Sequence, residues 1–189
     1  MILTGIGSRK RPTYIREIIL DVMTNLSPMS TLRSGAAYGC DSDFEELAKS
    51  KEIYLPWAGF NKSKSELYLS NINNLVKDYY LSNVGLVEYA DKIIQNVHPS
   101  YNRLSLAGKK LHTRNVFQVL GITLDKPSDL LICYTENGVT KGGTATAINI
   151  AKEFQVPVLN IGRLEDLLVL VDVGLCSKDM LNKVIHNYG

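Results

Sequence analysis

The chain has 189 residues, of which 45% are hydrophobic and 21% are charged, and its formal net charge is +2. This length favours one domain over residues 1–189, and the composition excludes a disordered or collagen-like chain. The three cysteines lie far apart, which excludes a disulfide framework and a CxxC metal pair. No apolar run reaches the roughly 18 residues of a membrane span. We therefore expect a cytoplasmic protein with no membrane contact, no metal and no cofactor.

Short apolar runs alternate with stretches of helical periodicity along the chain. Strands are expected at residues 2–6, 31–33, 52–55, 130–134 and 158–161. Helices are expected after Pro12, around Phe44, at about 85–97 and 105–120, after Gly143, and at about 164–172 and 178–187. Residues 58–75 have no clear period and predict a long loop or insertion with partial helix.

Uncharged strands separated by helices indicate a parallel sheet that is covered on both faces. Because crossovers between parallel strands are right-handed, we expect an α/β, Rossmann-like, doubly wound sheet of five strands in the order 3-2-1-4-5. In that order the first and fourth strands are neighbours, and their connections leave in opposite directions. Such folds bind ligands in the crevice beyond these strand ends, which selects residues 5–9 and 134–144.

The first strand ends in a glycine-rich turn. Gly5 and Gly7 let backbone N–H groups approach an anion, Ser8 adds a hydroxyl, and Arg9 can pair with phosphate. Residues 10–12 stand where a dinucleotide fingerprint has its third glycine, so NAD binding is disfavoured. The alternative is a plain strand-to-helix turn with a solvated basic cluster.

A second turn follows the second strand, beginning at Ser34 and Gly35. Asp41 has two interpretations there: it caps the next helix, or it accepts a hydrogen bond from a sugar or a base. Cys40 is expected to be a small buried residue rather than a nucleophile.

A third turn, with Gly142, Gly143 and Thr144, follows the most apolar strand and opens a helix. Unpaired N–H groups and the helix dipole attract phosphate at such a position. The order of residues excludes a Walker A loop, and the alternative is a plain glycine turn.

Polar residues interrupt the apolar side of the helix at 105–120, namely Arg114, Asn115 and Gln118. An inward-facing arginine needs an anion, which is either a buried ion-pair partner or a bound phosphate. His112 is expected to face solvent.

Trp57 follows Pro56, and it is either a stacking platform for a base or a core residue at a strand exit. No motif for metal or serine hydrolysis is present. If the domain is an enzyme, Asp41 and Glu136 are the carboxylates that we expect to act as base or nucleophile.

These motifs resemble those of the SMF/DprA–LOG (SLOG) superfamily of Rossmann-like proteins. Gly-Ser-Arg at 7–9, Ser-Gly-Ala-x-x-Gly-x-Asp at 34–41 and Gly-Gly-Thr at 142–144 have its order and spacing. Arg-Asn-x-x-Gln at 114–118 is similar to that of small DprA-like proteins that bacteriophages often encode. If the chain is encoded by a phage, the resemblance implies a location in the host cytoplasm. The resemblance covers residues 1–162 and implies a phosphate-bearing ligand.

Members of the superfamily differ in function. Lonely Guy enzymes hydrolyse the N-glycosidic bond of cytokinin nucleotides with a Pro-Gly-Gly-x-Gly-Thr-x-x-Glu loop, where this chain has Lys141, Ala145 and Asn149 in place of the proline, the third glycine and the glutamate. The resemblance therefore implies the phosphate-binding loop without the catalytic carboxylate. DprA proper binds single-stranded DNA, for which Arg9–Arg11 and Arg33 would supply a basic cluster.

Our leading expectation is a domain that binds a nucleotide or nucleotide-derived small molecule, with hydrolysis or transfer at the N-glycosidic bond if it is an enzyme. The alternatives are a DprA-like single-stranded DNA-binding protein and a non-catalytic sensor or sequestering protein for a nucleotide signal. A homo-oligomer that pairs through outer helices is expected by analogy. The expected binding residues are Gly5, Gly7, Ser8, Arg9, Ser34, Gly35, Trp57, Arg114, Asn115, Gly142, Gly143 and Thr144.

Overall fold

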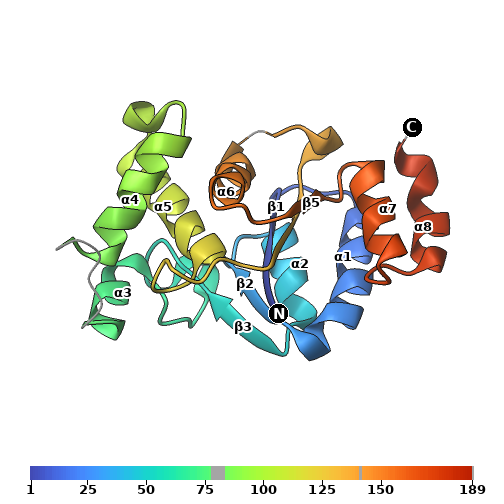
Figure 1. Cartoon of the computed structure of the whole chain (residues 1–189), viewed down its shortest axis with the longest axis horizontal. Coiled ribbons are helices and arrows are strands. Elements are labelled where there is room, and N and C mark those ends of the chain that lie inside the picture. Colours follow the sequence, from blue (N-terminus) through green and yellow to red (C-terminus); the bar gives the residue numbers. More distant parts are fainter. Residues whose placement is uncertain (78–83, 141, 189) are drawn as a thin grey trace.

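The computed structural model describes residues 1–77, 84–140 and 142–188. Its centre is a parallel sheet in which the strands follow the order β3-β2-β1-β4-β5 (Figure 1), as the sequence predicts. The strands are β1 (Ile2–Gly7), β2 (Thr31–Ser34), β3 (Ser50–Ile53), β4 (Leu130–Tyr134) and β5 (Val158–Asn160).

Helices cover both faces of the sheet (Figure 1). One face carries α1 (Thr13–Leu26), α2 (Cys40–Leu47), α7 (Leu164–Asp172) and α8 (Lys178–Val184). The other carries α4 (Leu86–Val97), α5 (Leu106–Leu120) and α6 (Gly142–Glu153), with α3 (Leu69–Leu75) packed against α4. The fold class is therefore the Rossmann-like α/β class that we expected.

Side chains of β1 alternate between the two layers. Leu3 belongs to the core beneath α1, α7 and α8, whereas Ile6 belongs to the core beneath α4, α5 and α6. Both residues are buried, because period-two alternation directs successive side chains to opposite faces of a sheet that is covered on each side.

The glycines of β1 have a packing role. A Cβ at Gly5 would lie 2.6 Å from Cγ of Phe44, and a Cβ at Gly7 would lie 2.7 Å from Cβ of Cys40. Phe44 and Cys40 both belong to α2. Gly5 and Gly7 therefore allow α2 to lie close against β1, which explains Gly5 without a ligand.

Three local expectations differ from the structure. The α2 helix begins at Cys40 with Gly39 in the N-cap position, so the interpretation of Asp41 as the cap is wrong. Gly39 has φ +87°, and a Cβ there would lie 2.5 Å from the carbonyl oxygen of Arg9, so a glycine is required. The third strand lies at Ser50–Ile53 rather than at 52–55. The last α-helix ends at Val184 rather than near 187, and a 3-10 helix at Ile185–Tyr188 follows it, as is frequent at helix C-termini.

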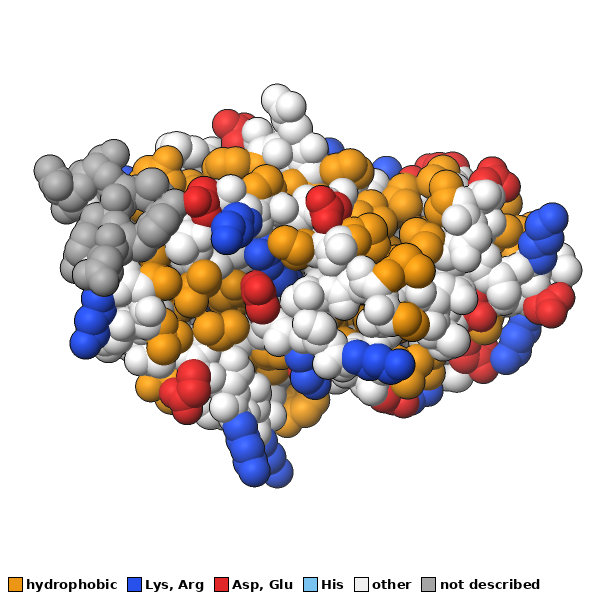
Figure 2. Space-filling model, turned by 60° about the horizontal axis from the view of Figure 1, so that its bottom comes forward, with side chains coloured by type: hydrophobic (Ala, Val, Ile, Leu, Met, Phe, Trp, Pro, Cys, Tyr) orange, Lys and Arg blue, Asp and Glu red, His pale blue; other side chains and the backbone are white. Residues whose placement is uncertain are grey.

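Figure 2 shows the face that comes forward when the lower side of Figure 1 is turned toward the reader. Lysine and arginine side chains are scattered over it, interspersed with acidic ones and with groups of hydrophobic side chains. The described part of this face therefore has no single-sign patch of the kind that attracts a polyanion. None of the helices in the described residues combines the length and apolar character that crossing a membrane requires.

We predict that Gly5→Val destabilises the protein by about 1–3 kcal/mol, because the new side chain overpacks the contact between β1 and Phe44. Urea unfolding measures the loss. Gly143→Ala is the control, since its new methyl group enters open space, and it should change stability by less than about 0.5 kcal/mol. Equal stabilities for Gly5→Val and the wild type would contradict the packing role.

Candidate functional site

A cleft of about 910 Å³ opens beyond the carboxyl ends of β1 and β4. Its walls come from the loop after β1, the start of α2, the middle of α5, the loop after β4 and the start of α6. We call it the switch-point cleft. It lies where the strand order predicts a ligand crevice, because the connections of β1 and β4 leave in opposite directions.

Backbone hydrogen bonds fix the loop after β1 at Ser8. Its N–H donates to the carbonyl of Tyr134 at 3.0 Å, and its carbonyl accepts from the N–H of Cys40 at 3.2 Å. Ser8 Oγ also accepts from the N–H of Lys10 at 3.1 Å. Arg9 and Lys10 follow this anchor, line the cleft and are exposed, and neither makes an ion pair with a described residue. Arg9 and Lys10 are therefore two cations without an ion-pair partner among the described residues, and they follow a backbone segment that hydrogen bonds hold in place.

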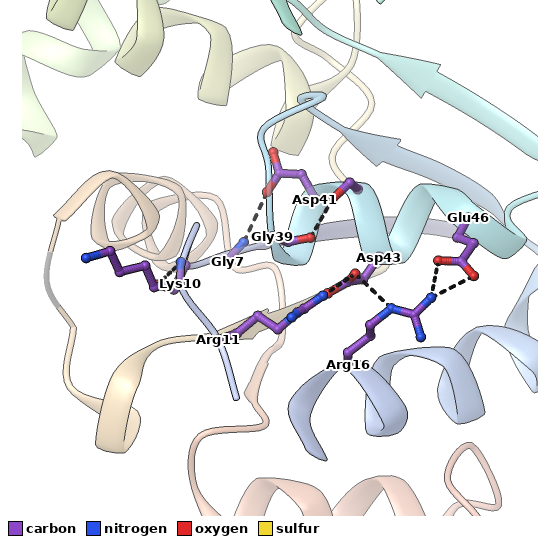
Figure 3. A network of polar contacts seen from close by, with 10 residues as sticks. Gly7, Lys10, Arg11, Arg16, Gly39, Asp41, Asp43 and Glu46 are labelled. Carbon is purple, nitrogen blue, oxygen red and sulfur yellow. Dashed lines mark hydrogen bonds and ion pairs between the residues drawn. The ribbon is translucent and has the colours of Figure 1, made fainter. Parts of the chain in front are cut away.

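The remaining members of the expected basic cluster are neutralised. Arg11 donates two hydrogen bonds to the carboxylate of Asp43, at 2.5 and 2.9 Å, and Arg16 approaches the same carboxylate at 3.5 Å (Figure 3). Arg33 is buried and donates to Glu52 at 2.7 Å. The expectation that Arg11 and Arg33 offer free charge is wrong, because each has an acidic partner.

Asp41 joins the end of β1 to the start of α2. Its carboxylate accepts hydrogen bonds from the N–H groups of Gly7 at 3.2 Å and Ala37 at 3.4 Å, and the first is drawn in Figure 3. The residue is only 1% exposed, and burial raises its pKa while the charge of Arg114 and the backbone N–H groups oppose that shift. Asp41 lines the cleft, but its oxygens already position the backbone around it.

Arg114 reaches the cleft from the opposite helical layer. Its side chain is buried, donates to the carbonyl of Gly35, and makes no ion pair with a described residue. Burial lowers its pKa, Asp41 raises it, and the charge of Arg9 lowers it again. Because Arg9 and Arg114 repel each other within one cleft, a bound anion would relieve both.

Asn115 connects α5 to the start of α6. Its Nδ2 donates to the carbonyl of Gly143 at 3.1 Å, whereas its Oδ1 is buried and has no hydrogen-bond partner among the described residues. Cβ atoms at Gly142 and Gly143 would meet nothing within 4 Å, so the first turn of α6 is open on the cleft. The N-terminus of α6, Arg9 and Arg114 therefore line the same cleft, and a helix N-terminus of this kind can attract an anion. The Oδ1 of Asn115 has the chemistry to accept a hydrogen bond from a sugar or a base.

The structure contradicts the expectation that His112 faces solvent. It lines the cleft half-buried, with Nδ1 2.8 Å from Oγ1 of Thr146 and its ring edge-to-face with His98 at 4.5 Å. Burial, followed by the charges of His98 and Arg114, lowers the pKa of His112 to about 4. Sequence reasoning missed this residue because a single histidine has no pattern of its own.

The structure brings most of the expected binding residues together and leaves some apart. Those that line the cleft are Gly7, Ser8, Arg9, Arg114, Asn115, Gly142, Gly143 and Thr144, together with the carboxylates Asp41 and Glu136. Ser34 lies behind it, with Oγ donating to the carbonyl of Gly5 at 2.8 Å. Gly35 makes room for Arg114, since a Cβ there would lie 1.9 Å from Nη1. Trp57 lines a different cavity.

Residues that align with the Lonely Guy loop do not complete a catalytic set. Asn149 does not line the cleft and donates to the carbonyl of Val97 at 3.4 Å. Lys141 lies outside the described residues. Cys40 is buried as expected, and burial raises the pKa of its thiol, so it does not supply a thiolate.

The structure is that of a Rossmann-like protein with a cleft at its topological switch point, and Arg9, Lys10 and Arg114 line this cleft. No protein-family model matches the chain, and no curated protein matches its sequence. Among solved structures, it is similar to the single-stranded DNA-binding DNA processing protein A (DprA) of Helicobacter pylori, with TM-score 0.52 and 17% identity, over 100% of this chain and 82% of that one. At this identity the likeness establishes a DprA-like fold.

We predict that His112 makes folding sensitive to acid. Its pKa is 6.5 ordinarily and about 4 in the folded protein, so the unfolded chain binds more protons between these values. Stability is therefore present above pH 6.5 and is lost as the pH falls toward 4. Urea unfolding at several pH values should show a steeper loss for the wild type than for His112→Gln, which keeps a partner for Thr146. Parallel curves would contradict the prediction.

Proposed function

We propose that the chain binds single-stranded DNA and that phosphate groups of the strand lie in the switch-point cleft. The observation that carries this proposal is that Arg9, Lys10 and Arg114 line the same cleft as the open first turn of α6 and that none of them forms an ion pair within 4.0 Å with a described residue. Asp41 acts on Arg114 through its charge without such a contact. The similar fold of DprA, which binds single-stranded DNA, supports the same choice.

The shape of the cleft favours a single strand over a duplex. Arg114 is 5% exposed at the bottom of a recess, where a flexible strand can bring a phosphate but a rigid double helix cannot. Tyr38 is 62% exposed and follows Ala37, which lines the cleft. An exposed aromatic ring beside a basic groove is typical of proteins that bind single strands by stacking on their bases.

We predict that Arg9→Ala weakens binding of an oligodeoxynucleotide similarly for all sequences, because a phosphate contact carries no sequence information. The slope of log affinity against log salt should become shallower by about 0.7, the value of one phosphate contact on a single strand. Fluorescence anisotropy over a salt series measures both quantities. Arg16→Ala is the control, because Arg16 is paired with Glu46 outside the cleft. Equal effects of the two variants would contradict the role of Arg9.

We predict that Arg114→Met separates a ligand-binding arginine from a structural one. Removal of this buried charge leaves Asp41 without the opposing charge of Arg114 and the Gly35 carbonyl without its donor, so the variant should be less stable. Under conditions in which the variant stays folded, loss of a charged hydrogen bond to phosphate should weaken binding about 10-fold or more. Gly35→Ala should also weaken DNA binding, because the new Cβ displaces the guanidinium of Arg114 without removing its charge. Unchanged DNA affinity together with lost stability would show that Arg114 is structural.

A second candidate is the binding of a nucleotide or nucleotide-derived small molecule in the same cleft, and the unpartnered Oδ1 of Asn115 favours it. This atom is buried at a lining residue, where one sugar or base donor would satisfy it. If hydrolysis of an N-glycosidic bond occurs, the carboxylates in reach are Asp41 and Glu136. Release of free base from nucleoside monophosphates, lost in Glu136→Gln, together with no oligonucleotide binding, would favour this candidate.

A further inference from the structure

A second cavity lies on the other side of α5 from the switch-point cleft. It has a volume of about 650 Å³ and lies between the loop after β3, the start of α3, α4 and the N-terminal half of α5. Its apolar lining comes from Trp57, Leu69, Val87, Tyr101 and Leu106. We call it the Trp57 cavity.

Trp57 presents an aromatic surface to this cavity. It is the single tryptophan of the chain and is 38% exposed, which excludes the interpretation of a core residue. Its ring packs edge-to-face on Phe60, with centroids 5.2 Å apart and planes at 87°. The contact with Phe60 holds the indole ring of Trp57 in place, while part of the indole stays accessible to solvent. Trp57 therefore has the properties of a ring on which a base can stack.

The charges around the Trp57 cavity favour an anionic ligand with an aromatic part. Its two carboxylates accept hydrogen bonds from neutral groups and keep their charge, since Asp91 accepts from Tyr101 and Thr113, and Glu88 accepts from the N–H of Gly85. Its three lysines outnumber these carboxylates and make no ion pair with a described residue, and Lys109 Nζ lies 4.4 Å from the centroid of the Tyr101 ring. The three lysines are Lys92, Lys109 and Lys110.

The Trp57 cavity and the switch-point cleft lie on opposite sides of α5, and both are lined by residues of this helix. Lys110 lines the cavity and the next residue, Leu111, lines the cleft. Phe60 contacts both sides, because it packs on Trp57 and lies 5.8 Å beneath the guanidinium of Arg114. One aromatic ring and one turn of α5 therefore separate the two hollows.

We propose that the Trp57 cavity is a second nucleotide subsite, in which a base of the bound strand stacks on Trp57 while the lysines contact the flanking phosphates. This inference rests on the proposed binding of single-stranded DNA in the switch-point cleft. The strand crosses α5 at Lys110 and Leu111, so that one part of it lies in each hollow.

Intrinsic fluorescence tests the subsite directly, because every photon of tryptophan emission comes from Trp57. The full chain is titrated with oligothymidylates of increasing length, and anisotropy of labelled oligonucleotides gives the affinity. The shortest oligonucleotides should bind in the cleft without a change in emission. Longer ones, which reach across α5, should quench Trp57 and bind more tightly.

Trp57→Ala should remove the gain in affinity of the longer oligonucleotides, a loss of about 5- to 150-fold, and leave the shortest ones unaffected. Lys110→Glu is a second variant at an exposed position in case Trp57→Ala fails to fold, and it should also weaken only the longer ones. Lys178→Glu on α8 is the matched control for the same charge change, and it should bind as the wild type does.

The outcomes separate this inference from the proposed function. Two results together would overturn the subsite and leave the proposed function in place. The first is binding without a change in Trp57 emission at any oligonucleotide length. The second is that Trp57→Ala and Lys110→Glu bind the longer oligonucleotides with the same affinity as the wild type. Quenching by thymidine monophosphate to the same extent as by a long oligonucleotide would also overturn it. No binding of any oligonucleotide would contradict the proposed function itself.

Discussion

The buried charges of Arg114 and Asp41 are the constraint on which the switch-point cleft depends. Arg114 comes from α5 and Asp41 from α2, so they bring the helical layers of opposite sheet faces together over the strand ends. Asp41 fixes the N–H groups of Gly7 and Ala37, and Arg114 fixes the carbonyl of Gly35. Burial of each charge is costly without such partners, which makes the surrounding backbone rigid.

This rigid base gives a nearly neutral protein a local basic site. The net charge is +2, yet the fold separates paired cations from free ones. Arg11 and Arg33 form ion pairs with Asp43 and Glu52, whereas Arg9 and Lys10, on the loop that Ser8 anchors, form none with the residues that the structure describes. The field that a phosphate meets is therefore set by which cations lack partners, rather than by how many the chain contains.

The sheet order and most element bounds are predictable from the sequence, because apolar runs, glycine turns and helical periods are local signals. The site is only partly predictable. The strand order places Gly7 and Gly143 at the same edge of the sheet, beyond the carboxyl ends of the strands. By contrast, tertiary packing decides that Gly5 faces Phe44. It also decides that Trp57 lies across α5 from the cleft. The environment of His112 likewise depends on His98, which directly follows α4, and on Thr146 of α6, and no pattern within α5 indicates these neighbours.

The most direct measurement of the central claim is a map of backbone amide chemical shifts during titration with a short single-stranded oligonucleotide. Phosphates in the cleft should shift the amides of Gly7, Ser8, Gly143 and Thr144 most strongly, because these four residues line the cleft. Amides of α7 and α8, on the other side of the sheet, should not move. Shifts confined to α7 and α8, or no shift at saturating oligonucleotide, would contradict the account.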